Sequence, residues 1–196
     1  MSNEALIIFA KNPELGKVKT RLAQSVGNET ALDIYHKLVA YTQEQTANIE
    51  AERIVYYTQD VDHNDNWRKA IRKVQASGDL GHKMAAAFRE ELKQYDRVCI
   101  VGADCAELTS AHIQQAFQKL KNNDFVLGPA NDGGYYLLGM KAFEPGLFAG
   151  IDWSTDKVLS QTIEAISELN NSYALLPKLI DVDTIEDWKQ VSENFK

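Results

Sequence analysis

The sequence lacks the features that mark several large classes of protein. No apolar run approaches the roughly 20 residues that a helix needs to cross a bilayer. The apolar start at 5–9 is short and has no basic segment before it, which argues against a signal peptide. Only two cysteines are present, Cys99 and Cys105, and no Cys/His cluster accompanies them, so a zinc site is not expected. These absences predict a cytoplasmic protein with reduced thiols.

Positive charge is also scarce. The chain of 196 residues has 21 Lys and Arg against 28 Asp and Glu, a net charge of −7. A nucleic-acid partner is therefore not expected, because nucleic-acid binders carry a basic surface. The sequence also contains no Walker A loop, no GxGxxG fingerprint and no GxSxG elbow. At 44% hydrophobic and 25% charged residues, the composition is that of an ordinary globular protein.

Short apolar runs alternate with amphipathic stretches along the whole chain. Strands are predicted at 5–9, 54–57, 73–75, 97–101, 125–127, 135–140 and 173–176. Helices are predicted over about 28–46, around 84–92, from a cap at 109 or 110, from a cap at 154 or 155, and from a capping box at 184–187. This alternation predicts an α/β protein, a mainly parallel sheet covered on both faces. With no linker or repeat in view, we expect one domain over 1–196.

Ligands of such sheets bind beyond the carboxyl ends of the strands. The first loop in that position is unusually basic and contains four cations around Gly16, namely Lys11, Lys17, Lys19 and Arg21. Glycine lets the chain turn, and backbone amides together with Lys and Arg side chains make a phosphate site. The alternative is a solvated basic loop, but its place after the first strand favours phosphate binding.

A second candidate follows the apolar run 97–101. Gly102 would let a ligand approach the backbone, and Asp104 would lie at the carboxyl end of the strand. A carboxylate there is suited to holding Mg²⁺ against a diphosphate. The alternative, an aspartate that caps a helix, is weakened because Thr109 and Ser110 are better placed for that role.

Three further segments have a structural interpretation beside a functional one. Asp132 stands before Gly133 and Gly134 in a typical turn signal, and would otherwise ligate metal, act as a base or bond a sugar hydroxyl. Trp153 is an ordinary core residue or a stacking surface for a sugar or base. The neighbouring Ser154 and Thr155 are expected to cap the next helix, whose N-terminus would also attract anions. Asp183 either precedes a helix as a favourable charge or shares a metal with Asp104.

Together these segments resemble a bacterial family of GT-A-type glycosyltransferases, designated DUF2064, whose members include proteins linked to arsenosugar biosynthesis. The family belongs to the nucleotide-diphospho-sugar transferase superfamily and is related to 2-phospholactate and molybdenum-cofactor guanylyltransferases. The matching pieces occur in family order and are FAKNPELGKVKTRL (9–22), GDLGHKMAAAF (78–88), VGADCAEL (101–108), LGPANDGGYYLLG (127–139), IDWSTDKVL (151–159) and DVDTIEDW (181–188).

The resemblance implies a three-layer, Rossmann-like α/β/α fold and a role for each segment. Phosphates would be held by Lys11, Gly16, Lys17, Lys19 and Arg21, with Gln75, Gly78 and Gly81 near the base. Mg²⁺ or Mn²⁺ would be bound by Asp104 and Asp183, and catalysis would involve Asp104, Asp132 and Lys19. The acceptor side would comprise Gly133, Gly134, Tyr135, Trp153, Ser154 and Thr155.

One position departs from the family pattern. The family usually has proline after the Asp-Cys pair, where this chain has Ala106, so the turn behind Asp104 is expected to be less stiff. The carboxylate itself is retained, so activity is still expected.

Three functions remain open at this stage. The first is glycosyl transfer from a nucleotide sugar to a small acceptor, which releases a nucleoside diphosphate. The second is nucleotidyl transfer from a nucleoside triphosphate to a phosphorylated small molecule, which releases pyrophosphate. The third is non-catalytic nucleotide binding. A monomer or homodimer is expected in each case.

Overall fold

The computed structural model describes residues 3–63 and 65–195. Within them, seven strands form one sheet. The strands are β1 (Glu4–Ala10), β2 (Glu52–Tyr57), β3 (Ile71–Val74), β4 (Arg97–Gly102), β5 (Phe125–Pro129), β6 (Tyr135–Met140) and β7 (Tyr173–Leu175). Their order in the sheet is β3-β2-β1-β4-β6-β5-β7. Each of these strands was predicted from its apolar run, with ends that differ by a few residues.

The sheet is mainly parallel, as the sequence predicted. β1 pairs in parallel with β2 and β4, which places Ile7 opposite Ile54 on one side and Ile100 on the other. β3 and β7 run parallel to their neighbours at the two edges. β6 runs antiparallel to both β4 and β5. The short loop between β5 and β6 contains the Asp132-Gly-Gly segment, so the turn that this motif favoured is present.

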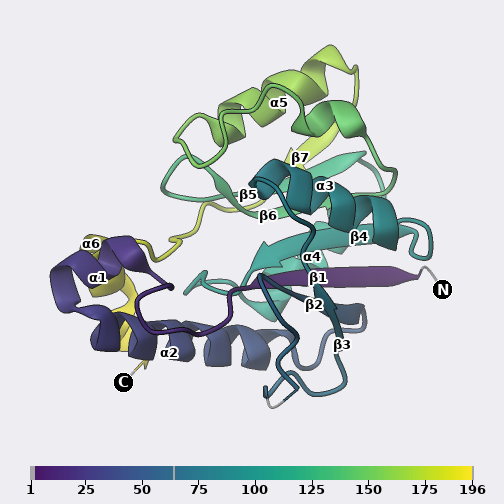
Figure 1. Cartoon of the computed structure of the whole chain (residues 1–196). Helices are drawn as coiled ribbons and strands as arrows, with labels where there is room; N and C mark the ends of the chain where they lie inside the picture. The colour runs from purple at the N-terminus through teal and green to yellow at the C-terminus, as the bar shows by residue number, and fades with distance from the viewer. Residues whose placement is uncertain (1–2, 64, 196) are drawn as a thin grey trace.

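Helices cover both faces of the sheet (Figure 1). The helical elements are α1 (Thr20–Val26), α2 (Asn28–Thr46), α3 (Leu80–Glu91), α4 (Ser110–Lys119), α5 (Val158–Glu168), α6 (Ile185–Val191) and the 3-10 turns η1 (Pro145–Phe148) and η2 (Ser192–Phe195). On one face Val39 of α2 and Phe117 of α4 join a core with side chains of the sheet. On the other face Phe88 of α3 and Ile166 of α5 do the same. The three-layer α/β/α prediction is therefore confirmed.

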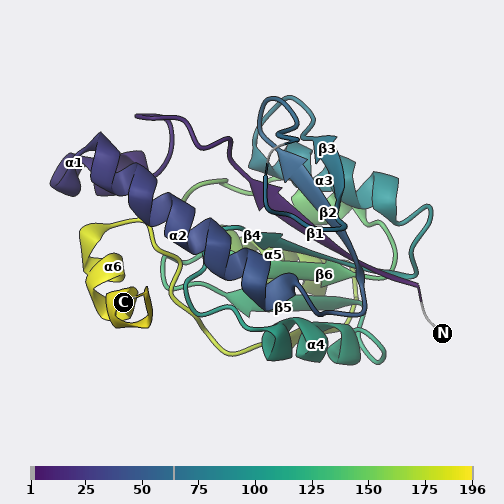
Figure 2. The same ribbon diagram turned by 90° about the horizontal axis from the view of Figure 1, so that it is seen from below.

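A third apolar cluster joins the two ends of the chain. Leu22 of α1 and Leu38 of α2 pack with Val182 and with Val191 of α6. Figure 2 shows α6 beside α1 and α2, although α6 is near the C-terminus. This packing brings the segment before α6 to the start of α1, so that residues 181–183 come close to residues 19–21.

Helix starts show where local sequence was decisive. Thr184 forms the predicted capping box with Asp187, and Thr109, one of the two N-caps predicted for α4, forms a capping box with His112. The prediction that Ser154 or Thr155 caps α5 was wrong, because the helix begins at Val158 and Lys157 precedes it without a side-chain cap. The Thr155 hydroxyl instead donates to the Asp152 carbonyl at 2.7 Å.

Helix α1 was not predicted, because its residues were assigned to the basic loop. It is seven residues long and is anchored by the fully buried Leu22. None of the helices in the described ranges is both long and apolar enough to cross a membrane.

Candidate functional site

Asp104 lies just beyond the end of β4, at the position predicted for it. Its carboxylate turns back over Gly102, since a Cβ placed on that glycine would lie 2.8 Å from Asp104 Oδ1. Real Cβ atoms do not come so close, so a side chain at position 102 would displace the carboxylate. Ala103 and Cys105 on either side are buried, which fixes the backbone that carries Asp104.

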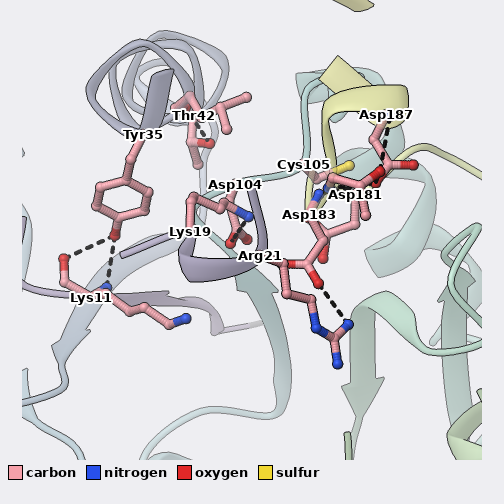
Figure 3. Close-up of polar contacts among 12 residues, drawn as sticks. Lys11, Lys19, Arg21, Tyr35, Thr42, Asp104, Cys105, Asp181, Asp183 and Asp187 are labelled. Atoms are coloured by element: carbon pink, nitrogen blue, oxygen red, sulfur yellow. Dashed lines mark hydrogen bonds and ion pairs between the residues drawn. The ribbon is translucent and has the colours of Figure 1, made fainter. Parts of the chain in front are cut away.

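Lys19 reaches Asp104 from the start of α1. Its Nζ donates to Asp104 Oδ2 at 2.7 Å, and the residue is only 6% exposed (Figure 3). Lys19 has the left-handed backbone angles φ 47° and ψ 47°, which few residues other than glycine adopt. Burial acts to lower the pKa of Lys19, but Asp104, Asp181 and Asp183 together raise it. In turn, burial acts to raise the pKa of Asp104, and Lys19 more than offsets this, so that pKa is lowered.

Asp181 is a site residue that sequence reasoning missed. It pairs with Cys105 in an isolated antiparallel bridge, which sets it beside Asp104. Its Oδ1 is buried and accepts no hydrogen bond from the residues that the structure describes. Burial, and then the charge of Asp104, raise the pKa of Asp181 to about 8. The sequence did contain a signal for Asp181, namely the apolar Val182 between two aspartates. In an extended segment the side chains alternate, so when Val182 is buried, Asp181 and Asp183 turn to the same side.

Asp183, predicted as a metal ligand with Asp104, is held by Arg21. Arg21 Nη1 donates to Asp183 Oδ2 at 2.9 Å, and both side chains are partly exposed. The pair joins α1 to the segment before α6, in line with the third apolar cluster. In this structure the Asp183 carboxylate and the Arg21 guanidinium are therefore bound to each other.

Some residues of the basic loop line the two cavities described next, and others do not. The backbone N–H of Lys11 donates to the Tyr35 hydroxyl at 2.8 Å, and that hydroxyl donates to the Lys11 carbonyl at 2.9 Å. Lys17 instead forms an ion pair with Glu14 at 2.5 Å. Gly16 has φ +76°, so it makes the turn that was expected of it. Neither Gly16 nor Lys17 lines the two cavities described next.

Two adjoining cavities meet at the aspartates. The outer one has a volume of about 560 Å³ and polar walls that include Lys11, Lys19, Arg21 and Asp183. The inner one, of about 300 Å³, lies over the strand ends and has mainly apolar walls. Both are lined by a common set of residues, Lys11, Leu80, Asp104, Tyr135 and Asp181.

Of the predicted base-side residues, Gln75 lines the inner cavity, whereas Gly78 and Gly81 line neither cavity. The Gln75 Nε2 donates to the Tyr56 carbonyl at 3.0 Å. Gly78 has φ +114°, a conformation that favours glycine. Gly81 lies under the indole of Trp153, where an added Cβ would be 2.2 Å from Trp153 Nε1.

The predicted acceptor-side residues line the outer cavity, with the exception of Gly133. Asp132 Oδ1 accepts from the Gly134 N–H at 2.9 Å, which is the turn interaction that the motif favoured. The Asp132 side chain is exposed and lines the outer cavity. Gly133 has φ +88° and touches the backbone of Asp156, so no other residue fits there without strain. Tyr135 lines both cavities, and burial raises its pKa.

Trp153, Ser154 and Thr155 line the same outer cavity. The Trp153 ring stacks on Phe148 with centroids 6.4 Å apart and planes 24° apart. It therefore belongs to the core on one side and borders the cavity on the other, which combines the two interpretations that the sequence left open.

A family model and one solved structure match the chain closely. The family described as "Uncharacterized protein conserved in bacteria (DUF2064)" matches residues 41–155. A crystal structure from Desulfovibrio desulfuricans G20, described as a "putative nucleotide-diphospho-sugar transferase", is 32% identical, with a TM-score of 0.91. The match covers 100% of this chain and 89% of that one. No curated protein matches the chain.

More distant structures share the fold. The 4-diphosphocytidyl-2C-methyl-D-erythritol synthase of Anaerococcus prevotii DSM 20548 is 14% identical, with a TM-score of 0.62 and 98% of each chain covered. Rv0371C of Mycobacterium tuberculosis H37Rv, solved as a complex with manganese, is 12% identical, with a TM-score of 0.56. That match covers 98% of this chain and 99% of the other.

Proposed function

The chain belongs to the bacterial family DUF2064, and from this premise we propose that it is a metal-dependent glycosyltransferase. In this proposal it moves a sugar from a nucleotide-diphospho-sugar to a small acceptor. The likeness to a protein described as a nucleotide-diphospho-sugar transferase supports a nucleotide-using transferase.

One observation carries the proposal: the two cavities meet at a cluster of Asp104, Asp181 and Lys19. A mainly apolar cavity suits a nucleoside, and a polar one suits phosphates and a hydroxylated acceptor. The bond that is broken in glycosyl transfer lies between the nucleotide diphosphate and the sugar. The charged cluster lies where the two halves of such a donor would join.

The residues present fit a divalent cation. Asp181 has a buried oxygen without a hydrogen-bond donor, and Asp104 lies beside it with a lowered pKa. No three Asp, Glu, His or Cys side chains of the described residues are grouped closely enough for a complete metal site. Mg²⁺ characteristically takes one or two carboxylates and completes its shell with water and substrate phosphates. We therefore assign Asp104 and Asp181 as its protein ligands and keep Asp183 as a further candidate.

The bound cation would neutralise the diphosphate as it leaves. The chain's own cations add to this, because Lys11, Lys19 and Arg21 line the outer cavity. Preorganised charge of this kind is usually the largest contribution to catalysis. Arg21 can bind phosphate only when it leaves Asp183. Because the pair is exposed, breaking it costs little free energy.

The acceptor half of the reaction falls to the wall that contains Asp132. The acceptor oxygen forms a bond to the anomeric carbon of the sugar, and the bond from that carbon to the diphosphate oxygen breaks. The acceptor proton passes to a carboxylate, for which Asp132 is the candidate because it is exposed and lines the outer cavity. Trp153 offers an apolar surface for the sugar ring.

Nucleotidyl transfer is the second candidate, and the three cations of the outer cavity favour it. A triphosphate carries more charge than a nucleotide sugar, and transfer of its α-phosphoryl group depends on positioning and charge. The same residues would hold the triphosphate, while the acceptor would be a phosphorylated molecule.

Product analysis separates the candidates. Purified protein is incubated with nucleotide sugars or nucleoside triphosphates, Mg²⁺ and a panel of acceptors, and the released product is identified. Nucleoside diphosphate indicates glycosyl transfer, and pyrophosphate indicates nucleotidyl transfer. Nucleotide binding that is unchanged in Asp104→Asn, without turnover of any donor, would instead indicate a non-catalytic binding protein.

A further inference from the structure

Three cations and five carboxylates line the outer cavity, and Asp104, Asp181 and Asp183 lie among the cations. The cations Lys11, Lys19 and Arg21 all come from the 11–21 segment. Another part of the lining, the acceptor wall, is formed by residues 132–135 and 153–158 and contributes the carboxylates Asp132 and Asp156. No Lys or Arg of that wall lines the cavity within the described ranges.

The cations are also already engaged. Lys19 is paired with Asp104, and Arg21 with Asp183. Any diphosphate that binds must recruit these same groups, together with Lys11. Within the described part of the chain, the Asp156 carboxylate has neither a hydrogen bond nor an ion pair. An exposed aspartate without a partner, facing a cavity, gives the acceptor wall a negative potential.

Resting on the proposed glycosyl transfer, we propose that the acceptor is a hydroxyl-bearing small molecule without an anionic group, and that an amine on it is favoured. An acceptor with a phosphate ester or a free carboxylate would be repelled by Asp132 and Asp156, and this wall supplies no cation to offset the repulsion. An uncharged polyol can donate hydrogen bonds to both carboxylates. An ammonium group gains attraction from them as well. The Trp153 ring at the same wall supplies apolar contact for a sugar ring.

Asp156 is then a residue that determines specificity for the acceptor. Asp132 is also placed to accept the reacting proton, so changing it would alter two properties at once. Asp156 is exposed and has no described polar partner, so its replacement should leave the fold intact. Glu164 offers a matched control, because it is exposed on α5 and does not line either cavity.

The test uses three matched probes: glucosamine, methyl glucoside and glucose 6-phosphate. Each is titrated into the full chain, with Trp fluorescence as the readout and Trp153→Phe to identify the responding residue. We expect glucosamine to bind more tightly than methyl glucoside, and glucose 6-phosphate to give no response. Asp156→Lys should weaken glucosamine binding by about 30-fold, because a roughly fivefold attraction between unit charges about 4 Å apart in water is replaced by a repulsion of the same size. Glu164→Lys should leave all three affinities unchanged.

A separate arm measures the binding of nucleoside diphosphates with Mg²⁺, in the wild type and in Asp104→Asn. If no nucleoside diphosphate binds, the proposed function is contradicted. The preference among the three probes is still measured separately, from the Trp153 fluorescence. The acceptor inference is overturned if glucose 6-phosphate binds as tightly as glucosamine. It is equally overturned if neither glucosamine nor methyl glucoside alters the Trp153 signal.

Discussion

Lys19 is the residue whose removal should reveal most about the cluster. Lys19→Met keeps an unbranched side chain of similar length, so the strain of the left-handed backbone is unchanged and mainly the charge is lost. Asp104 then loses its partner at 2.7 Å while Asp181 remains beside it. The charge on Asp104 is then left without its partner in a largely buried site, which should destabilise the fold.

The size of the loss follows from the burial of the pair. Removing one partner of a fully buried ion pair costs about 3–5 kcal/mol. The Lys19 side chain is 5% exposed, but that of Asp104 is 24% exposed, so water partly compensates the remaining charge. We therefore expect Lys19→Met to lower the free energy of unfolding by about 2–3 kcal/mol at pH 7. Asp104→Asn in the same background should restore part of the loss, because it removes the uncompensated charge.

Mg²⁺ should rescue this variant more than it stabilises the wild type. In the wild type the cation competes with Lys19 for Asp104, and in the variant it does not. A ligand at ten times its dissociation constant adds about 1.4 kcal/mol to the free energy of unfolding. Urea unfolding with and without MgCl₂ measures both effects, with Lys17→Met as the control, for which the loss should stay below about 0.5 kcal/mol. A Lys19→Met variant as stable as the control, or one indifferent to Mg²⁺, would refute this account of the cluster.

Three further predictions concern other parts of the molecule. Gly81→Ala should displace Trp153, lower the free energy of unfolding by about 1–3 kcal/mol and change the Trp fluorescence; an unchanged spectrum would contradict this. Ser172 lowers the pKa of Asp124 to about 2, below the unfolded value of about 3.9, so this stabilisation is present above pH 4 and lost as the pH falls through 2. Asp124→Asn should therefore lower the free energy of unfolding by about 1 kcal/mol at pH 7 and leave it nearly unchanged near pH 2, as measured by urea unfolding. A loss of the same size at both pH values would contradict this. Arg21→Met should change stability by less than 1 kcal/mol but weaken nucleoside diphosphate binding about tenfold by calorimetry, and equal affinity would argue against a phosphate role.

The sequence predicted those features that depend on local pattern. Helix α2 spans the predicted 28–46, because its apolar residues keep helical spacing throughout. Thr109 and Thr184 cap helices through contacts only three residues away. Asp104 lies at a strand end, because an apolar run stops at a glycine just before it.

Features that depend on contacts between distant segments were not predicted. Asp181 joins Asp104 only because α6 packs on α1 and α2, some 150 residues apart in the chain. The Arg21–Asp183 pair has the same origin. The four cations of the first loop were treated as one group, yet the turn at Gly16 leads Lys17 to Glu14 while the start of α1 leads Lys19 to Asp104. Charge spacing in a sequence does not say which way each side chain points.

Metal-dependent binding of a nucleotide sugar is tested most directly by a thermal-shift panel of nucleoside diphosphates and nucleotide sugars, with and without Mg²⁺. A ligand that binds the folded protein must raise its melting temperature. Asp104→Asn keeps an oxygen that can accept from Lys19, so the variant should fold and provide the comparison. We predict a rise with nucleotide sugars that requires Mg²⁺ and is lost in Asp104→Asn. Well-folded protein that responds to no nucleotide, with or without Mg²⁺, would contradict the account.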